Sequence, residues 1–487
     1  MARIILGREE FRRKVLGCWI GKNVGGTLGT PYECQKGVLS LSFYDPVPTE
    51  PLPNDDLDLQ LVWLKMLEDR GHDVTVDDFA EYWMKYLSAY PWNEYGFCAR
   101  NLERGLKPPV SGWFENYYVD EMGSPIRSEI WACLCPADPQ RAAALAWMDS
   151  AMDHAGGEGT WGEMFWAAVE SAAFVESDPL TLIEIGLAMI PPSSDISRVI
   201  REAIWCRASG QTWAEARERV VTIFGNNQPC NAIQNHGFTI IGWLYGEDFG
   251  DKLCKAVNCS YDTDCTGATL GSVLGIIGGV ESIPEKWIAP IGHGIVLHRF
   301  TGKFDSPKTV EELTDRTIAL AESYVAGVSP DVAFGAATAL PPDMLGLLSR
   351  TSLAYAASAR DVRAATVRTG DATISLHYNG DPVLRPALSR EIDITAEYQG
   401  QPSPVSDVTV GAPAGWVVTQ TGTSRFSVTA PSFDKAVKLT VAAVVAGTQR
   451  SAKFTVLSPG EATGYAAAKG VPSCPKCGGR IGACICE

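Results

Sequence analysis

Residues 258–279 read NCSYDTDCTGATLGSVLGIIGG, and this stretch decides how the rest of the chain is interpreted. Gly267, Gly271 and Gly275 recur every four residues within it, so all three fall on one face of a helix. A face of small residues allows a second helix to approach closely. The apolar residues between the glycines predict that this helix is buried.

Four carboxylates stand at two predicted helix starts. Asp262 and Asp264 precede the glycine-rich helix, while Asp55 and Asp56 lie in the first turn of a helix that Asn54 would cap. Acids at a helix start gain about 0.3–1 kcal/mol each from the helix dipole, so either pair alone could be an ordinary cap. If the two starts meet, four carboxylates that close cannot all stay ionised without cations. Oxygen donors favour hard divalent ions, Mg²⁺ first.

A third motif, GCWIGKNVGGTLGTPYE, occupies residues 17–33. Together with the early Asp-Asp and the late Asp-x-Asp before a glycine-rich helix, it resembles the ADP-ribosylglycohydrolase family, which includes the dinitrogenase-reductase-activating glycohydrolases. The resemblance covers roughly residues 10–300. It implies an all-α domain with two Mg²⁺ ions that hydrolyses an N- or O-glycosidic bond to the ribose of ADP-ribose.

The resemblance also implies roles for single residues. Glu33, which follows Pro31, would lie beside the metals and act as general acid or base. The implied metal ligands are Asn54, Asp55, Asp56, Asp262, Asp264, Cys265 and Thr266. Relatives carry Thr or Ser at the place of Asn54, Thr at that of Cys265 and an acid at that of Gly26. A thiol is a poor ligand for a hard ion, so either Thr266 substitutes for Cys265 or the site loses a ligand.

Substrate contacts are implied further along the chain. Arg127 is the expected anion contact because of its fork-shaped guanidinium, with a surface salt bridge as the alternative. His154 is expected to support the site, and the turn at Gly156 and Gly157 offers backbone amides to a phosphate or hydroxyl. Asn235 could reach the site, or it could cap and pack.

Composition limits the class of protein. The chain has 487 residues, of which 46% are hydrophobic and 20% charged, as in soluble globular proteins of two or more domains. A net charge of −16 argues against non-specific nucleic-acid binding. No secretory signal and no apolar segment of membrane-spanning length are evident. We expect a cytoplasmic protein without a membrane partner, with most of its fourteen cysteines reduced and buried.

The predicted order of domains is an all-α domain over residues 1–330, a linker or docking helix over 331–360, a β-sandwich over 361–458 and a Cys-rich tail over 459–487. Short alternating runs between Gly, Pro and Asp turns predict the sandwich, most simply an immunoglobulin-like accessory domain. The tail holds Cys474, Cys477, Cys484 and Cys486, which predict either a zinc knuckle or a flexible metal-free terminus.

The sequence thus predicts a Mg²⁺-dependent glycoside hydrolase acting on an ADP-ribosyl group. Two alternatives stay open: a glycosidase of the same fold acting on a different furanoside, and a non-catalytic homologue that binds a ligand. Retention of the four aspartates argues against the last.

Overall fold

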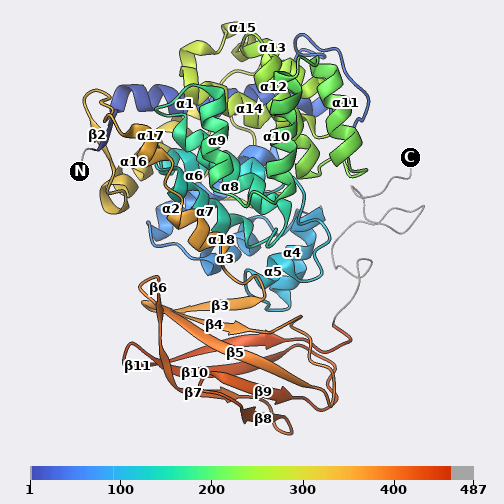
Figure 1. Cartoon of the computed structure of the whole chain (residues 1–487), viewed down its shortest axis with the longest axis vertical. Coiled ribbons are helices and arrows are strands. Elements are labelled where there is room, and N and C mark those ends of the chain that lie inside the picture. Colours follow the sequence, from blue (N-terminus) through green and yellow to red (C-terminus); the bar gives the residue numbers. More distant parts are fainter. Residues whose placement is uncertain (1–2, 91–92, 462–487) are drawn as a thin grey trace. The chain divides into compact units, whose positions relative to one another are not determined.

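The computed structural model describes residues 3–90 and 93–461 (Figure 1). The chain forms two compact units. The first contains the chain up to Asp73 together with Asp120–Trp147 and Gly157–Ala359. The second contains Val74–Val119, Met148–Gly156 and the chain from Arg360 onward.

The first unit is helical, as predicted. Its α-helices are α1 (Arg8–Gly29), α2 (Asp55–Arg70), α6 (Ser128–Leu134), α7 (Pro139–Ser150, whose end enters the second unit), α8 (Glu158–Ala172), α9 (Pro179–Ala188), α10 (Asp195–Ala208), α11 (Trp213–Phe224), α12 (Ala232–Tyr245), α13 (Phe249–Asn258), α14 (Thr263–Gly278), α15 (Glu285–Ile288), α16 (Val310–Val328), α17 (Met344–Leu348) and α18 (Ser352–Ser358). Three short 3₁₀ helices join them, η1 (Thr30–Tyr32), η2 (Pro125–Arg127) and η3 (Val280–Ser282). None of the described helices is both long and apolar enough to span a membrane.

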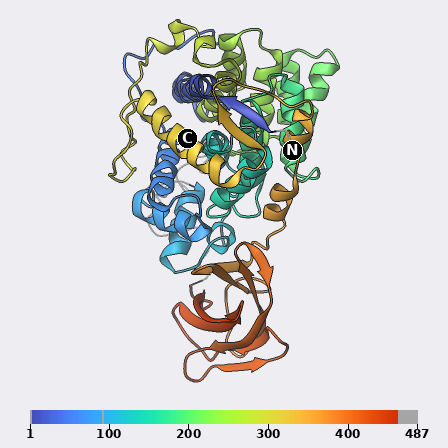
Figure 2. The same ribbon diagram turned by 90° about the vertical axis from the view of Figure 1, so that its left-hand side faces the viewer.

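The first unit also contains a small parallel sheet that the prediction of an all-α domain did not include. Strand β1 (Ile4–Gly7) pairs with β2 (Val332–Gly335), and Figure 2 shows the two strands side by side. The β-branched pair at the start of β1 favours an extended strand. Residues 331–360, predicted as a linker or docking helix, carry β2, α17 and α18, and all of them up to Ala359 belong to the first unit.

Helices α1 and α14 run antiparallel in direct backbone contact at the centre of this unit. A Cβ atom added at Gly21 would lie 2.1 Å from the carbonyl oxygen of Gly271, and one added at Gly25 would lie 1.9 Å from that of Gly267. The predicted glycine face of α14 is therefore confirmed, and its partner helix carries matching glycines. This pairing places the C-terminal end of α1 against the N-terminal end of α14.

The second unit contains two antiparallel sheets. One has the strand order β11-β10-β7 and the other β3-β4-β5-β9-β8, with β6 pairing with β5 (Figure 1). The strands are β3 (Ala364–Thr369), β4 (Ala372–His377), β5 (Ser389–Tyr398), β6 (Gln401–Ser403), β7 (Val405–Gly411), β8 (Val417–Gln420), β9 (Arg425–Thr429), β10 (Val437–Val445) and β11 (Thr448–Val456). Buried and less buried residues alternate along β4 and β10, which confirms that β-sheets follow the helical part. An immunoglobulin-like connectivity stays a prediction.

Residues in and next to α5 contribute to the core of these sheets. The unit includes α3 (Val76–Tyr86), α4 (Asn93–Glu103) and α5 (Val110–Trp113). Leu106, Val110 and Phe114 are buried in the same apolar core as the strands. The predicted zinc ligands Cys474, Cys477, Cys484 and Cys486 lie outside the described residues.

Candidate active site

The segment that follows α1 is paired through its backbone with the segment that precedes α14. The amide of Cys34 donates to the carbonyl oxygen of Tyr261 at 2.8 Å, and the amide of Tyr261 donates to that of Gln35 at 2.6 Å. Cys34, Ser260 and Tyr261 have φ values of 69°, 69° and 71°, in the left-handed region. Such backbone strain in non-glycine residues concentrates at functional sites. This pairing holds Glu33 beside the residues that open α14.

Carboxylates from three segments converge at this point. Oxygen atoms of Glu33, Asp262 and Asp264 lie within 4.8 Å of one another, and so do ligand atoms of Asp56, Asp264 and Cys265. Asp264 belongs to both groups, so the two helix starts meet as the sequence predicted. We call Glu33, Asp56, Asp262, Asp264 and Cys265 the acid cluster.

Asp55 stands next to the acid cluster in the first turn of α2, and it is half-buried. Its charge repels those of Glu33 and Asp56. It is not one of the residues whose ligand atoms converge within 4.8 Å in the described part of the chain. Its role as a metal ligand stays a prediction.

Several oxygens of the acid cluster are buried without a donor. Asp56 and Asp262 are each 1% exposed and Asp264 is 7% exposed. Within the described residues, neither Asp262 oxygen, nor Asp56 Oδ2, nor Asp264 Oδ1 accepts a hydrogen bond of normal geometry. Buried carboxylates without donors are costly unless a cation or a proton compensates them. The cluster therefore fits divalent cations.

The electrostatics of the cluster agree with this reading. Repulsion from Asp264, then burial, raises the pKa of Glu33 to about 10, although its side chain is exposed at the edge of the cluster. Burial raises the pKa values of Asp56 and Asp262 well above their ordinary range, and the pKa of Asp264 is raised for the same reason. Without cations the cluster retains protons at neutral pH, and bound cations would release them.

Comparison with known proteins assigns the family. A family model described as ADP-ribosylglycohydrolase matches residues 7–325. The chain belongs to the ADP-ribosylglycohydrolase family. This is a family of hydrolases that cleave glycosidic bonds of ADP-ribosyl groups and generally bind divalent metals. A solved structure named ADP-ribosylglycohydrolase-related protein complex is similar over 65% of this chain and 99% of that one, at 18% identity and a TM-score of 0.44. No curated protein matches the chain.

Asn54 lies where α2 begins and beside Gly26 of α1. Its side-chain oxygen accepts the amide of Asp56 at 2.8 Å, so it caps α2 as predicted. A Cβ atom added at Gly26 would lie 2.3 Å from the Asn54 side-chain nitrogen. The Asn54 amide therefore fills the space that an acid at position 26 would need, which links the two departures from the family pattern. Its role as a metal ligand stays a prediction, because its oxygen is engaged in the cap.

Two further predicted residues support the start of α14. The side-chain oxygen of Asn235 accepts the amide of Asp262 at 3.2 Å, and its nitrogen donates to the carbonyl oxygen of Pro229 at 2.7 Å. Asn235 thus positions a cluster residue, and its contact with substrate stays a prediction. The hydroxyl of Thr266 donates to the carbonyl oxygen of Thr263 at 3.1 Å. Thr266 is buried within α14, and its substitution for Cys265 as a ligand also stays a prediction.

A buried cation, not predicted from the sequence, lies close to the acid cluster. Lys22 is fully buried on α1 and donates to Glu129 at 2.8 Å. Gln60 joins the network by donating to the second Glu129 oxygen at 2.8 Å and to the carbonyl oxygen of Asp56 at 3.0 Å. Burial opposes the charge of Lys22, but attraction by Glu129 and Asp56 outweighs it and raises the Lys22 pKa. In the sequence, the signal that could have indicated this buried cation is a lysine within a run of small and apolar helix residues.

Arg127 lies in the interior of the first unit, not on its surface. It is fully buried, donates to the carbonyl oxygen of Gly123 at 2.7 Å and lies 3.9 Å from a Glu163 oxygen. The alternative of a surface salt bridge is therefore wrong, because the ion pair is buried. Anion binding by Arg127 stays a prediction.

His154 belongs to the second unit and is paired with acids. Its Nδ1 lies 2.9 Å from Asp153 and its Nε2 lies 3.5 Å from Glu94. Burial alone would lower the pKa of His154, but the two carboxylates raise it to about 9. Gly156 has a φ of 79° in the same unit, whereas Gly157 caps α8 in the first unit. The substrate roles of all three stay predictions.

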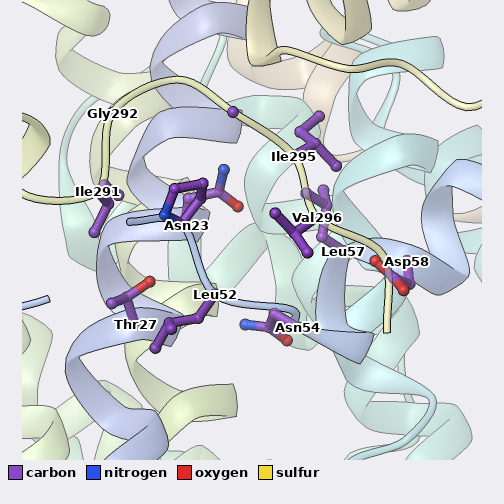
Figure 3. A pocket seen from close by; sticks show the side chains of 12 residues that line it. Asn23, Thr27, Leu52, Asn54, Leu57, Asp58, Ile291, Gly292, Ile295 and Val296 are labelled. Atoms are coloured by element: carbon purple, nitrogen blue, oxygen red, sulfur yellow. The ribbon is translucent and has the colours of Figure 1, made fainter. Parts of the chain in front are cut away.

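A small hollow lies next to α2. It lies between Asn23, Asn54 and the loop 291–296, and Figure 3 shows the side chains that line it. Its volume of about 10 Å³ holds about one water molecule. Asp58 also borders it and accepts the amide of His298 at 2.6 Å. Burial raises the pKa of Asp58 to about 7.

Proposed function

We propose that this protein is a Mg²⁺-dependent hydrolase that cleaves an N- or O-glycosidic bond to the ribose of an ADP-ribosyl group. The observation that carries the proposal is the convergence of Glu33, Asp262 and Asp264 where α1 meets α14, with buried oxygens that lack donors. Family membership supports the reaction class. Two cations are proposed because the carboxylates form two groups that share Asp264.

The donors fit hard cations with one exception. Asp55, Asp56, Asp262 and Asp264 would hold the ions through oxygen, while Cys265 is the one soft donor in the cluster. Bound Mg²⁺ would supply Lewis-acid polarisation and orient the ribose hydroxyls and a water.

The remaining work falls to residues of the chain. Glu33 is exposed at the edge of the cluster, so a substrate can reach its carboxyl oxygens, and it would transfer the proton at the scissile bond. Asn235 holds the backbone of Asp262, and Asn54 holds that of Asp56. An oxocarbenium-like transition state would gain from the surrounding negative charge.

The replacement of a threonine by Cys265 favours one alternative, a different furanoside as glycone, because it changes a donor next to Asp56 and Asp264. A panel of ADP-ribosylated protein, ADP-ribose conjugates and simple pentofuranosides separates the two proposals. Each substrate is assayed with Mg²⁺ and with chelator. Asp262→Asn is compared with Asp195→Asn, a helix first-turn acid on α10 that lies outside the cluster.

We expect Mg²⁺-dependent release of the aglycone from an ADP-ribosyl substrate, lost in Asp262→Asn and retained in Asp195→Asn. Release of the aglycone from a pentofuranoside alone would show that the glycone is a simple pentofuranose and not ADP-ribose. No hydrolysis of any member, with Mg²⁺ bound, would overturn the proposed activity.

A further inference from the structure

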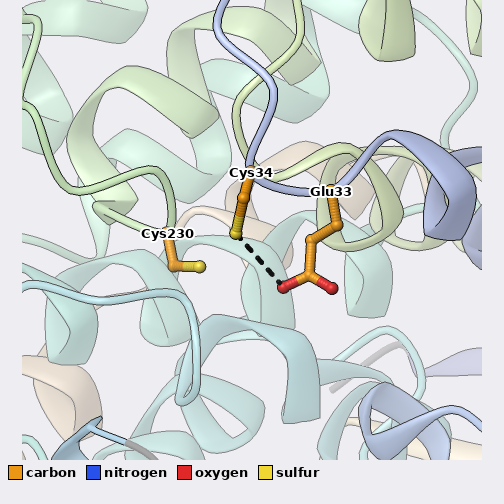
Figure 4. A group of neighbouring side chains, drawn as sticks. All are labelled: Glu33, Cys34 and Cys230. Atoms are coloured by element: carbon orange, nitrogen blue, oxygen red, sulfur yellow. Dashed lines mark hydrogen bonds between the residues drawn. The ribbon is translucent and has the colours of Figure 1, made fainter. Parts of the chain in front are cut away.

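Two cysteines from distant segments meet beside Glu33. The sulfur atoms of Cys34 and Cys230 and a carboxylate oxygen of Glu33 lie within 4.8 Å of one another (Figure 4). The Cys34 thiol lies 3.9 Å from Glu33 Oε1. The cation sites proposed above consist of carboxylates and one thiol, that of Cys265, whereas this group has two thiols and one carboxylate and is a chemically different set of donors.

Backbone hydrogen bonds hold both cysteines. The amide of Cys34 donates to the carbonyl oxygen of Tyr261 at 2.8 Å, and the carbonyl oxygen of Cys230 accepts the amide of Met122 at 2.8 Å. Asn231, the residue after Cys230, forms an isolated antiparallel β-bridge with Glu121. Preorganised ligands lose little freedom when an ion binds.

Cys34 is also accessible from solvent. Cys34 is exposed and Cys230 is half-buried, whereas the other cysteines in the described part of the chain are buried. Neither forms a disulfide in the structure. An ion or reagent from solvent can therefore reach Cys34.

The spacing suits a tetrahedral thiophilic ion. With Zn–S of about 2.3 Å and Zn–O of about 2.1 Å, a sulfur and an oxygen ligand lie about 3.6 Å apart and two sulfurs about 3.8 Å apart. The observed 3.9 Å between Cys34 Sγ and Glu33 Oε1 differs from this by a few tenths of an ångström. Thiolates select soft or borderline ions such as Zn²⁺ over Mg²⁺.

We propose that Glu33, Cys34 and Cys230 form a binding site for a thiophilic divalent cation, with Zn²⁺ as the matching ion and water as the fourth ligand. Binding displaces the thiol protons to solvent. Because Glu33 is shared with the acid cluster, a Zn²⁺ ion here withdraws its carboxylate from proton transfer and inhibits hydrolysis. The binding site stands apart from the proposed function, and only the inhibition rests on it.

The test uses Co²⁺ as a spectroscopic probe in reduced full-length protein whose four tail cysteines are serine, with Mg²⁺ in excess to occupy the acid cluster. Thiolate coordination gives an intense charge-transfer absorption. Cys34→Ser and Cys230→Ser are compared with Cys206→Ser, a control on α10, and circular dichroism checks that each variant is folded. Zn²⁺ is then added as competitor.

We expect one Co²⁺ per chain with a thiolate absorption that Zn²⁺ removes. Cys34→Ser and Cys230→Ser should each weaken this absorption and the affinity for Co²⁺, because one of the two thiolates is lost, and Cys206→Ser should keep both unchanged. Glu33→Gln should keep the absorption with affinity reduced about tenfold. Absence of the band in the parent protein, or an undiminished band in either thiol variant as expected from Cys265, would overturn the site. If the Co²⁺ band is present but Zn²⁺ does not slow hydrolysis, the binding site stands and only the proposed inhibition is overturned.

Discussion

Replacing Gly25 by alanine should damage both the fold and the site. Alanine in a helix interior is ordinarily better than glycine by about 1 kcal/mol. At this position, however, the new Cβ atom would lie 1.9 Å from the carbonyl oxygen of Gly267 and 2.3 Å from its carbonyl carbon. Both partners are backbone atoms, so no side chain can move aside. Since nonbonded heavy atoms need about 3 Å, α1 and α14 must separate by about 1 Å at this point.

The separation has two measurable consequences. Overpacking of this kind costs about 1–3 kcal/mol, and the rigid backbone contact places Gly25→Ala at or above the top of that range. The same shift moves Glu33 away from Asp262, and a misplacement of about 1 Å can reduce turnover about 10²-fold. We expect a lower urea midpoint together with weaker hydrolysis.

The matched control is Gly327→Ala on α16, where the added Cβ would meet only a His72 carbon at 3.7 Å. This change should be neutral or stabilising by up to about 1 kcal/mol. Urea denaturation followed by helix circular dichroism measures both variants against the wild type. A Gly25→Ala protein as stable and active as Gly327→Ala would refute the claim that backbone contact between α1 and α14 positions the site.

Three further predictions concern the cluster and the second unit. Asp262→Asn should weaken Mg²⁺ binding at least about tenfold by calorimetry while leaving the metal-free protein equally or more stable, and unchanged Mg²⁺ affinity would count against Asp262 as a ligand. In chelator, the raised pKa values of Asp56, Asp262 and Glu33 mean that the folded protein holds more protons than the unfolded chain. Its melting temperature should therefore fall as pH rises from about 4 toward 10, and Mg²⁺ should flatten this slope; a rising melting temperature in chelator would contradict the pKa assignment. Ending the chain at Ala359 removes the strands that pack on Leu106, Val110 and Phe114 and so exposes these apolar side chains. Gel filtration should therefore find aggregated protein. A monodisperse product that binds Mg²⁺ would show that the helical part folds alone.

The sequence predicted those features that follow from local spacing. The four-residue glycine repeat fixed the close face of α14, and the apolar stripe after Asn54 predicted α2 with its cap. Short alternating runs predicted that β-strands follow the helical part, and β3 to β11 lie there. Strand β3 shows the pattern poorly because its start is alanine-rich, and β7 because Ser406 and Asp407 interrupt its apolar residues.

The remainder depends on contacts between distant segments. Nothing near Lys22 indicates that Glu129 would neutralise it, and nothing near Arg127 indicates full burial. The packing of Leu106, Val110 and Phe114 with the sheets likewise depends on a core built by residues far apart in the chain. Family resemblance supplied the chemistry of the acid cluster, and the structure supplied the donor-free oxygens that make a cation fit.

The most direct test of the proposed activity is single-turnover hydrolysis of an ADP-ribosyl substrate by Glu33→Gln, with Mg²⁺ occupancy measured in the same samples. The substitution keeps the size of the side chain and removes its proton transfer. The proton-transfer role of Glu33 predicts turnover lower by about 10²–10⁴-fold with Mg²⁺ occupancy close to that of the wild type. Hydrolysis at the wild-type rate by Mg²⁺-loaded Glu33→Gln would contradict it.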